Sequence, residues 1–206
     1  MSSLFELFIK GGPIMWPLLA LSLAAVTVIA ERGFFLVAEW RKQKPEVVES
    51  ALRLAEQGDW EAARQAVAGQ VDPVARVLAA GLATPPDALV HTLQRSAERE
   101  LQRQARGINW LDTCITAAPL LGLLGTVTGM IRAFSVIGGA DLGAPSAITG
   151  GIGEALIATS FGLGIALMAL FPFNYFTARL EGFRHRLQDA CTALEIASQP
   201  FRHPPA

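Results

Sequence analysis

Three polar side chains in two apolar stretches are the residues of this sequence that could do chemistry. Thr126 lies in AAPLLGLLGTVTGMI, and Glu154 and Thr159 lie in GIGEALIATSFGLGIAL. An ionisable group at membrane depth is costly, so the first hypothesis is that the Glu154 carboxylate belongs to a proton pathway. Alternatively, Glu154 lies at a helix end outside the bilayer, where it costs little. The hydroxyls likewise either line a file of water or bond back to carbonyls of their own helices.

The depth of these side chains follows from helix geometry. If the outer helix ends lie near Ile137 and Thr149, then Thr126 and Thr159 are both about 15 Å deep, close to mid-membrane. Glu154 lies about one and a half turns below its end, inside the apolar slab. Because Glu154 and Thr159 differ by about 140° around a regular helix, they cannot both point straight into one lumen.

Small residues recur along both stretches at helical spacing, which is typical of closely packed membrane helices. The first stretch places Ala118, Gly122, Thr126 and Ala133 near one face, with Gly125 and Gly129 alongside, and the second repeats Gly150, Glu154, Ala158, Gly162 and Ala166. Pro119 lies in the first stretch, where a membrane helix tolerates a kink. These residues predict helix packing, and they favour a Glu154 that lies against neighbouring helices and not toward lipid.

Composition indicates a membrane protein. Of the 206 residues 51% are hydrophobic and 17% are charged, and the charges are bunched between long apolar runs. There is no basic block typical of nucleic-acid binding, no nucleophile–base pair, and no nucleotide loop. Cys114 and Cys191 are far apart and lack metal-site spacing, so we expect neither a disulfide nor a metal or other cofactor. The predicted fold class is all-α, a polytopic membrane protein with three transmembrane helices. An enzyme is not expected.

The apolar runs and turn residues divide the chain into seven segments. These are an interfacial segment (1–12), a first span (13–38), a cytoplasmic helical domain (41–107), a second span (108–137), a link (138–149), a third span (150–178) and a cytoplasmic tail (179–206). Asp59 and Asp72 are positioned to begin helices inside the helical domain. With no breaker before Pro119, residues from Asp87 to Ile137 predict one long second helix that extends into the cytoplasm. A signal peptide ending near Ala30 is the alternative for the first span, but apolar character continues beyond it.

The positive charges predict the orientation. Ten Arg and Lys residues lie between Arg41 and Arg106 and four lie from Arg179 onward, whereas the N-terminus has only Lys10 and the link has none. The positive-inside rule then places the N-terminus in the periplasm and the C-terminus in the cytoplasm of a bacterial inner membrane.

The segments AAPLLGLLGTVTGMI (117–131) and GIGEALIATSFGLGIAL (151–167), with three spans and a helical insert, resemble the MotA/TolQ/ExbB proton-channel family. The resemblance is closest to the three-span ExbB and TolQ members, since the flagellar stator branch typically has four spans. By motif match, the family's lumen residues fall on Thr126, Thr159 and Glu154, and its motif proline falls on Pro119. Arg132, near the outer end of the second span, has no place in this pattern.

The resemblance also implies an assembly and a function. It implies a homopentamer in membrane lipid, with a single-span ExbD- or TolR-like protein in the lumen whose aspartate titrates. Proton-motive force would then drive work in the periplasm through a TonB- or TolA-like protein. The sequence leaves open whether this work is TonB-dependent transport, TolQ-like envelope maintenance, or that of another proton-driven machine such as gliding or secretion. A purely structural membrane scaffold is the remaining alternative.

Overall fold

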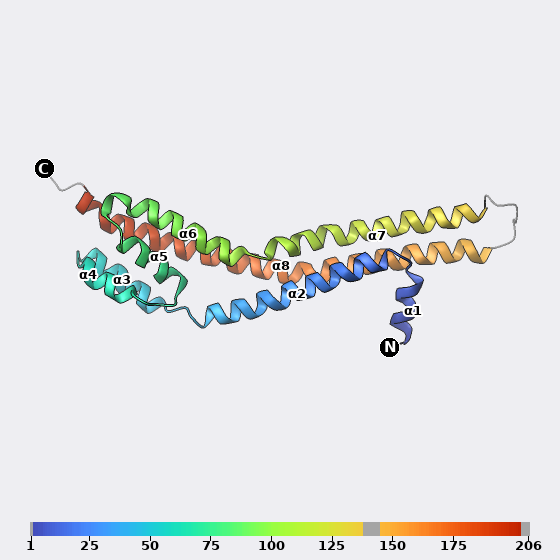
Figure 1. Cartoon of the computed structure of the whole chain (residues 1–206), viewed down its shortest axis with the longest axis horizontal. Coiled ribbons are helices and arrows are strands. Elements are labelled where there is room, and N and C mark those ends of the chain that lie inside the picture. Colours follow the sequence, from blue (N-terminus) through green and yellow to red (C-terminus); the bar gives the residue numbers. More distant parts are fainter. Residues whose placement is uncertain (1, 138–144, 203–206) are drawn as a thin grey trace. The chain divides into compact units, whose positions relative to one another are not determined.

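The computed structural model describes residues 2–137 and 145–202, and the side chains of 5–135 and 149–199. Every regular element in these residues is a helix (Figure 1). The elements are α1 (Ser2–Lys10), α2 (Met15–Trp40), α3 (Pro45–Glu56), α4 (Trp60–Val67), α5 (Pro73–Leu82), the 3-10 helix η1 (Pro86–Ala88), α6 (Leu89–Ala105), α7 (Ile108–Ile137) and α8 (Pro145–Arg202). Most of the predicted link, residues 138–144, lies outside the described residues.

Three of these helices, α2, α7 and α8, are long and apolar enough to cross a membrane. Their surfaces carry large apolar side chains that would be costly in water, such as Leu23, Leu120 and Leu156, which are 60%, 64% and 62% exposed. The predicted all-α class with three membrane-length helices is therefore confirmed.

The short helices begin where acidic side chains can accept from the free backbone N–H groups of a first turn. Asp59 accepts from the N–H of Ala62 at the start of α4. Asp72 accepts from the N–H groups of Val74 and Ala75 at the start of α5. Both predicted helix starts are confirmed.

The prediction of one long helix from Asp87 to Ile137 is wrong. Helix α6 ends at Ala105 and α7 begins at Ile108, and between them Gly107 adopts a left-handed φ of 83°. The positive φ favours glycine at this position, and the glycine lies against a residue distant in sequence. A Cβ on Gly107 would lie 3.3 Å from Nε of Arg32, a buried residue of α2 that also pairs with Glu31 at 2.8 Å.

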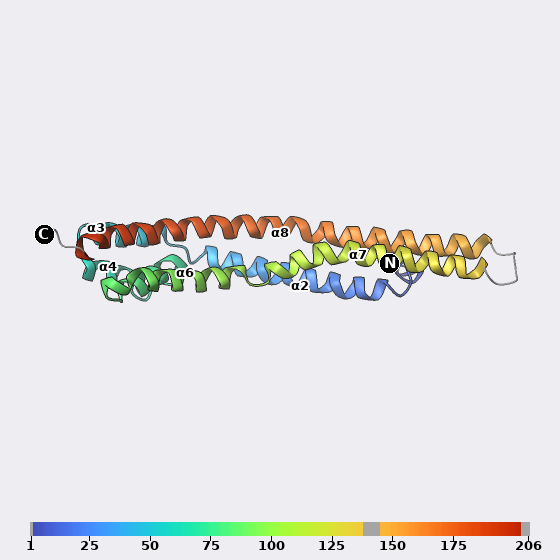
Figure 2. The ribbon, with the colours of Figure 1, turned by 90° about the horizontal axis from the view of Figure 1, so that it is seen from above.

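The chain forms two compact units. Unit 1 comprises residues 1–32 and 107–175, and unit 2 comprises 33–106 and 176–206. In unit 1, α7 and α8 run side by side (Figure 2). Its apolar core consists of Met15, Leu18, Ala118, Ile165 and Ala166, so α2, α7 and α8 all contribute to it.

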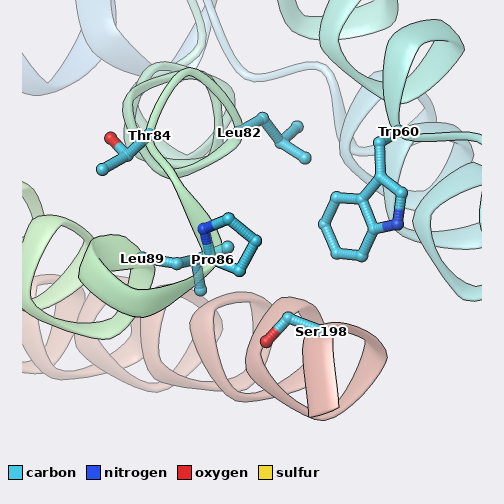
Figure 3. A pocket seen from close by; sticks show the side chains of 6 residues that line it. All are labelled: Trp60, Leu82, Thr84, Pro86, Leu89 and Ser198. Carbon is cyan, nitrogen blue, oxygen red and sulfur yellow. The ribbon is translucent and has the colours of Figure 1, made fainter. Parts of the chain in front are cut away.

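Unit 2 has an apolar core of its own, to which α3, α4, α5, α6 and the end of α8 contribute. A cavity of about 120 Å³ lies between α4, α5, η1, α6 and the end of α8 (Figure 3). Its lining is mainly apolar and is formed by Trp60, Leu82, Thr84, Pro86, Leu89 and Ser198. Leu89 is only 2% exposed, so its side chain is part of the packed wall.

Unit 2 also contains an ionic cluster around a buried carboxylate at the end of α2. Glu39, whose side chain is 3% exposed, pairs with Lys42 at 3.1 Å and lies 3.8 Å from Arg76 of α5. Arg76 in turn bonds Glu100 of α6 at 2.9 Å. Arg76 thus joins two carboxylates from different helices.

Candidate functional site

The candidate site is built on a seam of small residues between α7 and α8. On α7, a Cβ at Gly122 would lie 3.0 Å from Cα of Thr159, and one at Gly129 would lie 2.8 Å from the carbonyl oxygen of Gly151. On α8, a Cβ at Gly162 would lie 2.5 Å from the carbonyl oxygen of Ala118. The two backbones are therefore in direct contact, which only small residues permit.

The remaining residues expected to pack have different surroundings. Gly125 faces Ala158, which is fully buried, and a Cβ on this glycine would overlap the alanine side chain. Pro119 lies half-buried within α7. A Cβ on Gly150 would meet no other part of the chain within 4 Å, so the α8 side of the seam begins one residue later, at Gly151.

Thr159 is half-buried at the centre of this seam. Its Oγ1 donates to the carbonyl of Gly122 across the seam at 3.0 Å and lies 3.2 Å from the carbonyl of Ala155 in its own helix. The hydroxyl of Thr126 donates to the carbonyl of Leu123, 2.7 Å away in its own helix. Both hydroxyls therefore donate to helix carbonyls, and that of Thr159 also joins α7 to α8.

Glu154 forms an ion pair with the residue that sequence reasoning could not place. Its Oε1 accepts from Nη1 of Arg132 on α7 at 2.7 Å. The Glu154 side chain is 19% exposed and that of Arg132 is 53% exposed. The carboxylate therefore lies largely against neighbouring helices. Spacing was the missed signal, since Arg132 lies five residues before Ile137 and Glu154 five residues after Thr149.

The turn between α1 and α2 lies against the same carboxylate. Gly12 has a φ of 73°, and a Cβ on it would overlap the Glu154 carboxylate. A Cβ on Gly11 would lie 3.0 Å from Cγ2 of Ile157, one turn further along α8. Sequence analysis did not assign these glycines a role, because only the folded chain brings the turn next to Glu154.

Three other side chains lie outside this arrangement. Asp112 is exposed near the start of α7, two residues after Trp110, which is 65% exposed. Cys114 and Cys191 are free thiols. Among the described residues no group of three or more His, Cys, Asp or Glu side chains is placed to hold a metal ion.

These features define a class of protein: a helical membrane protein whose two glycine-rich spans meet in a close seam that carries a carboxylate and a hydroxyl. The chain belongs to the MotA/TolQ/ExbB proton channel family, whose sequence model matches residues 70–189. This confirms the resemblance found in the sequence.

Individual relatives agree with the family. The biopolymer transport protein ExbB-like 1 of Synechocystis sp. is 38% identical over 180 residues, which cover 83% of this chain and 69% of the relative. ExbB-like 3 of the same organism is 31% identical over 201 residues, or 95% of each chain. The Tol-Pal system protein TolQ of Haemophilus influenzae is 32% identical over 100 residues, which cover 47% of this chain and 44% of the relative.

Proposed function

We propose that this protein is a ring-forming subunit of an inner-membrane proton channel that energises work in the periplasm or at the outer membrane. One observation carries the proposal: membrane-length helices α7 and α8 hold Thr159 and Glu154, both partly buried, along one close seam. Polar groups kept inside membrane helices are expensive, so they mark ion and proton pathways. Membership of a proton channel family supports the same conclusion.

The proposed pathway uses three residues and a partner. Thr126 and Thr159 contribute hydroxyls at mid-membrane depth, and Glu154 sets the charge above them. The chain itself acts without enzymatic chemistry or a cofactor. A homopentamer would enclose a single-span ExbD- or TolR-like protein whose aspartate carries the proton. A TonB- or TolA-like protein would deliver the work, with the N-terminus of this chain in the periplasm and its C-terminus in the cytoplasm.

The test is proton flux into vesicles that contain the protein together with an ExbD- or TolR-like single-span protein. Thr159→Val keeps the side-chain volume but removes the hydroxyl that bonds Gly122, so we expect flux to be lost while the complex still assembles. Glu154→Ala should also abolish flux. Thr159→Ser retains the hydroxyl and should conduct. Ser160→Ala is the second control, because the Ser160 hydroxyl is exposed and bonds only its own helix at Leu156.

Full flux in both Thr159→Val and Glu154→Ala would refute the channel. A TolQ-like role in envelope maintenance is the second candidate, and the relative named TolQ supports it. The periplasmic protein that co-purifies with the complex distinguishes this role from TonB-type transport. A complex that purifies without any single-span partner and shows no proton-dependent function would instead support the structural scaffold.

A further inference from the structure

The ion pair between Arg132 and Glu154 has a geometry that fixes the carboxylate. Arg132 reaches from α7 and Glu154 from α8, and Nη1 and Oε1 are 2.7 Å apart. An N–H···O bond of this length between charged groups is strong and directional. Since Glu154 lies beside the seam, the guanidinium determines where its carboxylate points.

The turn between α1 and α2 closes over the carboxylate held in this way. Gly12 leaves no room for a Cβ because the Glu154 carboxylate occupies that space, and Gly11 lies against Ile157. The left-handed φ of 73° also favours glycine at position 12. Two consecutive glycines thus fit α8 over one helical turn, and the fit at Gly12 depends on the position of a single carboxylate.

We propose that Arg132 is a positioning residue for Glu154, and that the ion pair locks the Gly11–Gly12 turn, and with it α1, against α8. If the guanidinium is lost, the charged carboxylate has no partner in the seam and turns toward water. The Gly11–Gly12 turn then loses its contact with the Glu154 carboxylate. This inference rests on the proposed function in one respect, which is that Glu154 belongs to the proposed proton pathway. If it does, the ion pair couples the position of α1 to that pathway.

The lock is tested by the distance between spin labels at Ile9→Cys on α1 and Leu156→Cys on α8, both exposed sites, at 63% and 62%. The native cysteines are replaced, and the labelled chain is diluted with unlabelled protein in lipid vesicles. We expect one narrow distance distribution in the parent protein. Arg132→Gln and Glu154→Gln should each broaden it and shift it to longer distances. Arg132→Lys keeps the positive charge and should restore the narrow distribution.

A matched pair of glycine variants tests the turn itself. Gly12→Ala should broaden the distribution because its Cβ displaces the carboxylate. Gly69 has nearly the same backbone conformation, with a φ of 69°, but no atom lies near its would-be Cβ. Gly69→Ala therefore carries the same backbone strain without the collision, and it should leave the distribution narrow.

The lock is refuted if Arg132→Gln leaves the distribution as narrow as in the parent, or if Arg132→Lys broadens it as much as Arg132→Gln. Proton flux through the parent protein, measured with an ExbD- or TolR-like single-span partner, separates this inference from the proposed function. If the parent conducts protons but Arg132→Gln leaves the distances unchanged, the lock alone is refuted. If the distances respond as expected but the parent conducts no protons, the channel is refuted and the lock stands.

Discussion

Replacing Gly162 by alanine should push α7 and α8 apart. The added Cβ would lie 2.5 Å from the carbonyl oxygen of Ala118, whereas ordinary contact begins at 3.4 Å, so the backbones are too close by 3.4 minus 2.5, or about 0.9 Å. The obstructing atom belongs to the backbone and cannot rotate away. A separation of this size would stretch the bond from Thr159 to the Gly122 carbonyl, now 3.0 Å, beyond hydrogen-bonding distance.

The expected cost combines two effects. Overpacking of a well-fitted contact costs about 1–3 kcal/mol, and the lost hydrogen bond costs about 0.5–1.5 kcal/mol more. Thermal unfolding of the purified protein in detergent, followed by its helical signal, measures the change. For a chain of this size each kcal/mol corresponds to about 2–4 °C.

Gly164 provides the matched control, two residues along the same helix. No atom lies within 4 Å of its would-be Cβ, so alanine there has room. Alanine is also the better helix former, by about 0.5–1 kcal/mol. We therefore expect Gly164→Ala to raise the unfolding temperature slightly and Gly162→Ala to lower it. If both variants shift it in the same direction, or if Gly162→Ala is as stable as the parent, the seam is not as close as described.

Three further predictions concern unit 2. Arg76→Gln removes a partner from the buried Glu39 and the partly buried Glu100, so the free energy of unfolding should fall by about 1–3 kcal/mol in a denaturant titration. Leu89→Ala enlarges the cavity in Figure 3 and should cost about 2–5 kcal/mol in the same titration. Burial, with a smaller effect of the Glu195 carboxylate, raises the pKa of the Cys191 thiol from 9.0 to about 11, which leaves about 100-fold less thiolate at pH 8. Its alkylation by iodoacetamide should therefore be slow in the folded protein and accelerate between pH 9 and 11.

Each of these predictions has its own control. Arg184→Gln removes only a surface pair with Glu181, in which both side chains are about half exposed, so its stability should match that of the parent. Leu89→Met nearly conserves side-chain volume and should recover most of the loss caused by Leu89→Ala. For Cys191, the unfolded chain should react at the ordinary rate. Rapid alkylation of the folded protein at pH 8 would contradict the burial of the thiol.

The sequence predicted the features of the fold that depend on residues close together in the chain. The starts of α4 and α5 follow from Asp59 and Asp72, which accept from backbone N–H groups one turn ahead. The three membrane-length helices follow from apolar runs. These features need no knowledge of the fold, because the residues that determine them are close neighbours in the chain.

Contacts between distant residues could not be predicted in the same way. Gly107 lies between two helices with a left-handed φ, next to Arg32, which is far earlier in the chain. A lone glycine in a helical pattern is otherwise tolerated. Likewise, the partner of Glu154 is Arg132 on another helix, and the Gly11–Gly12 turn near the N-terminus lies against its carboxylate. The equal distances of Arg132 and Glu154 from the expected helix ends were the one available clue.

The pairing of Arg132 with Glu154 also bears on how the chain enters the bilayer. Each side chain alone would oppose transfer of its helix into lipid, because a single charge must be stripped of water. Only residues 138–144 separate α7 from α8, so the two helices can insert together as a hairpin. With the guanidinium already bonded to the carboxylate, this pair adds no net charge to the inserting hairpin. Insertion and pairing then become a single event, and a variant that lacks one partner should be deficient in membrane integration.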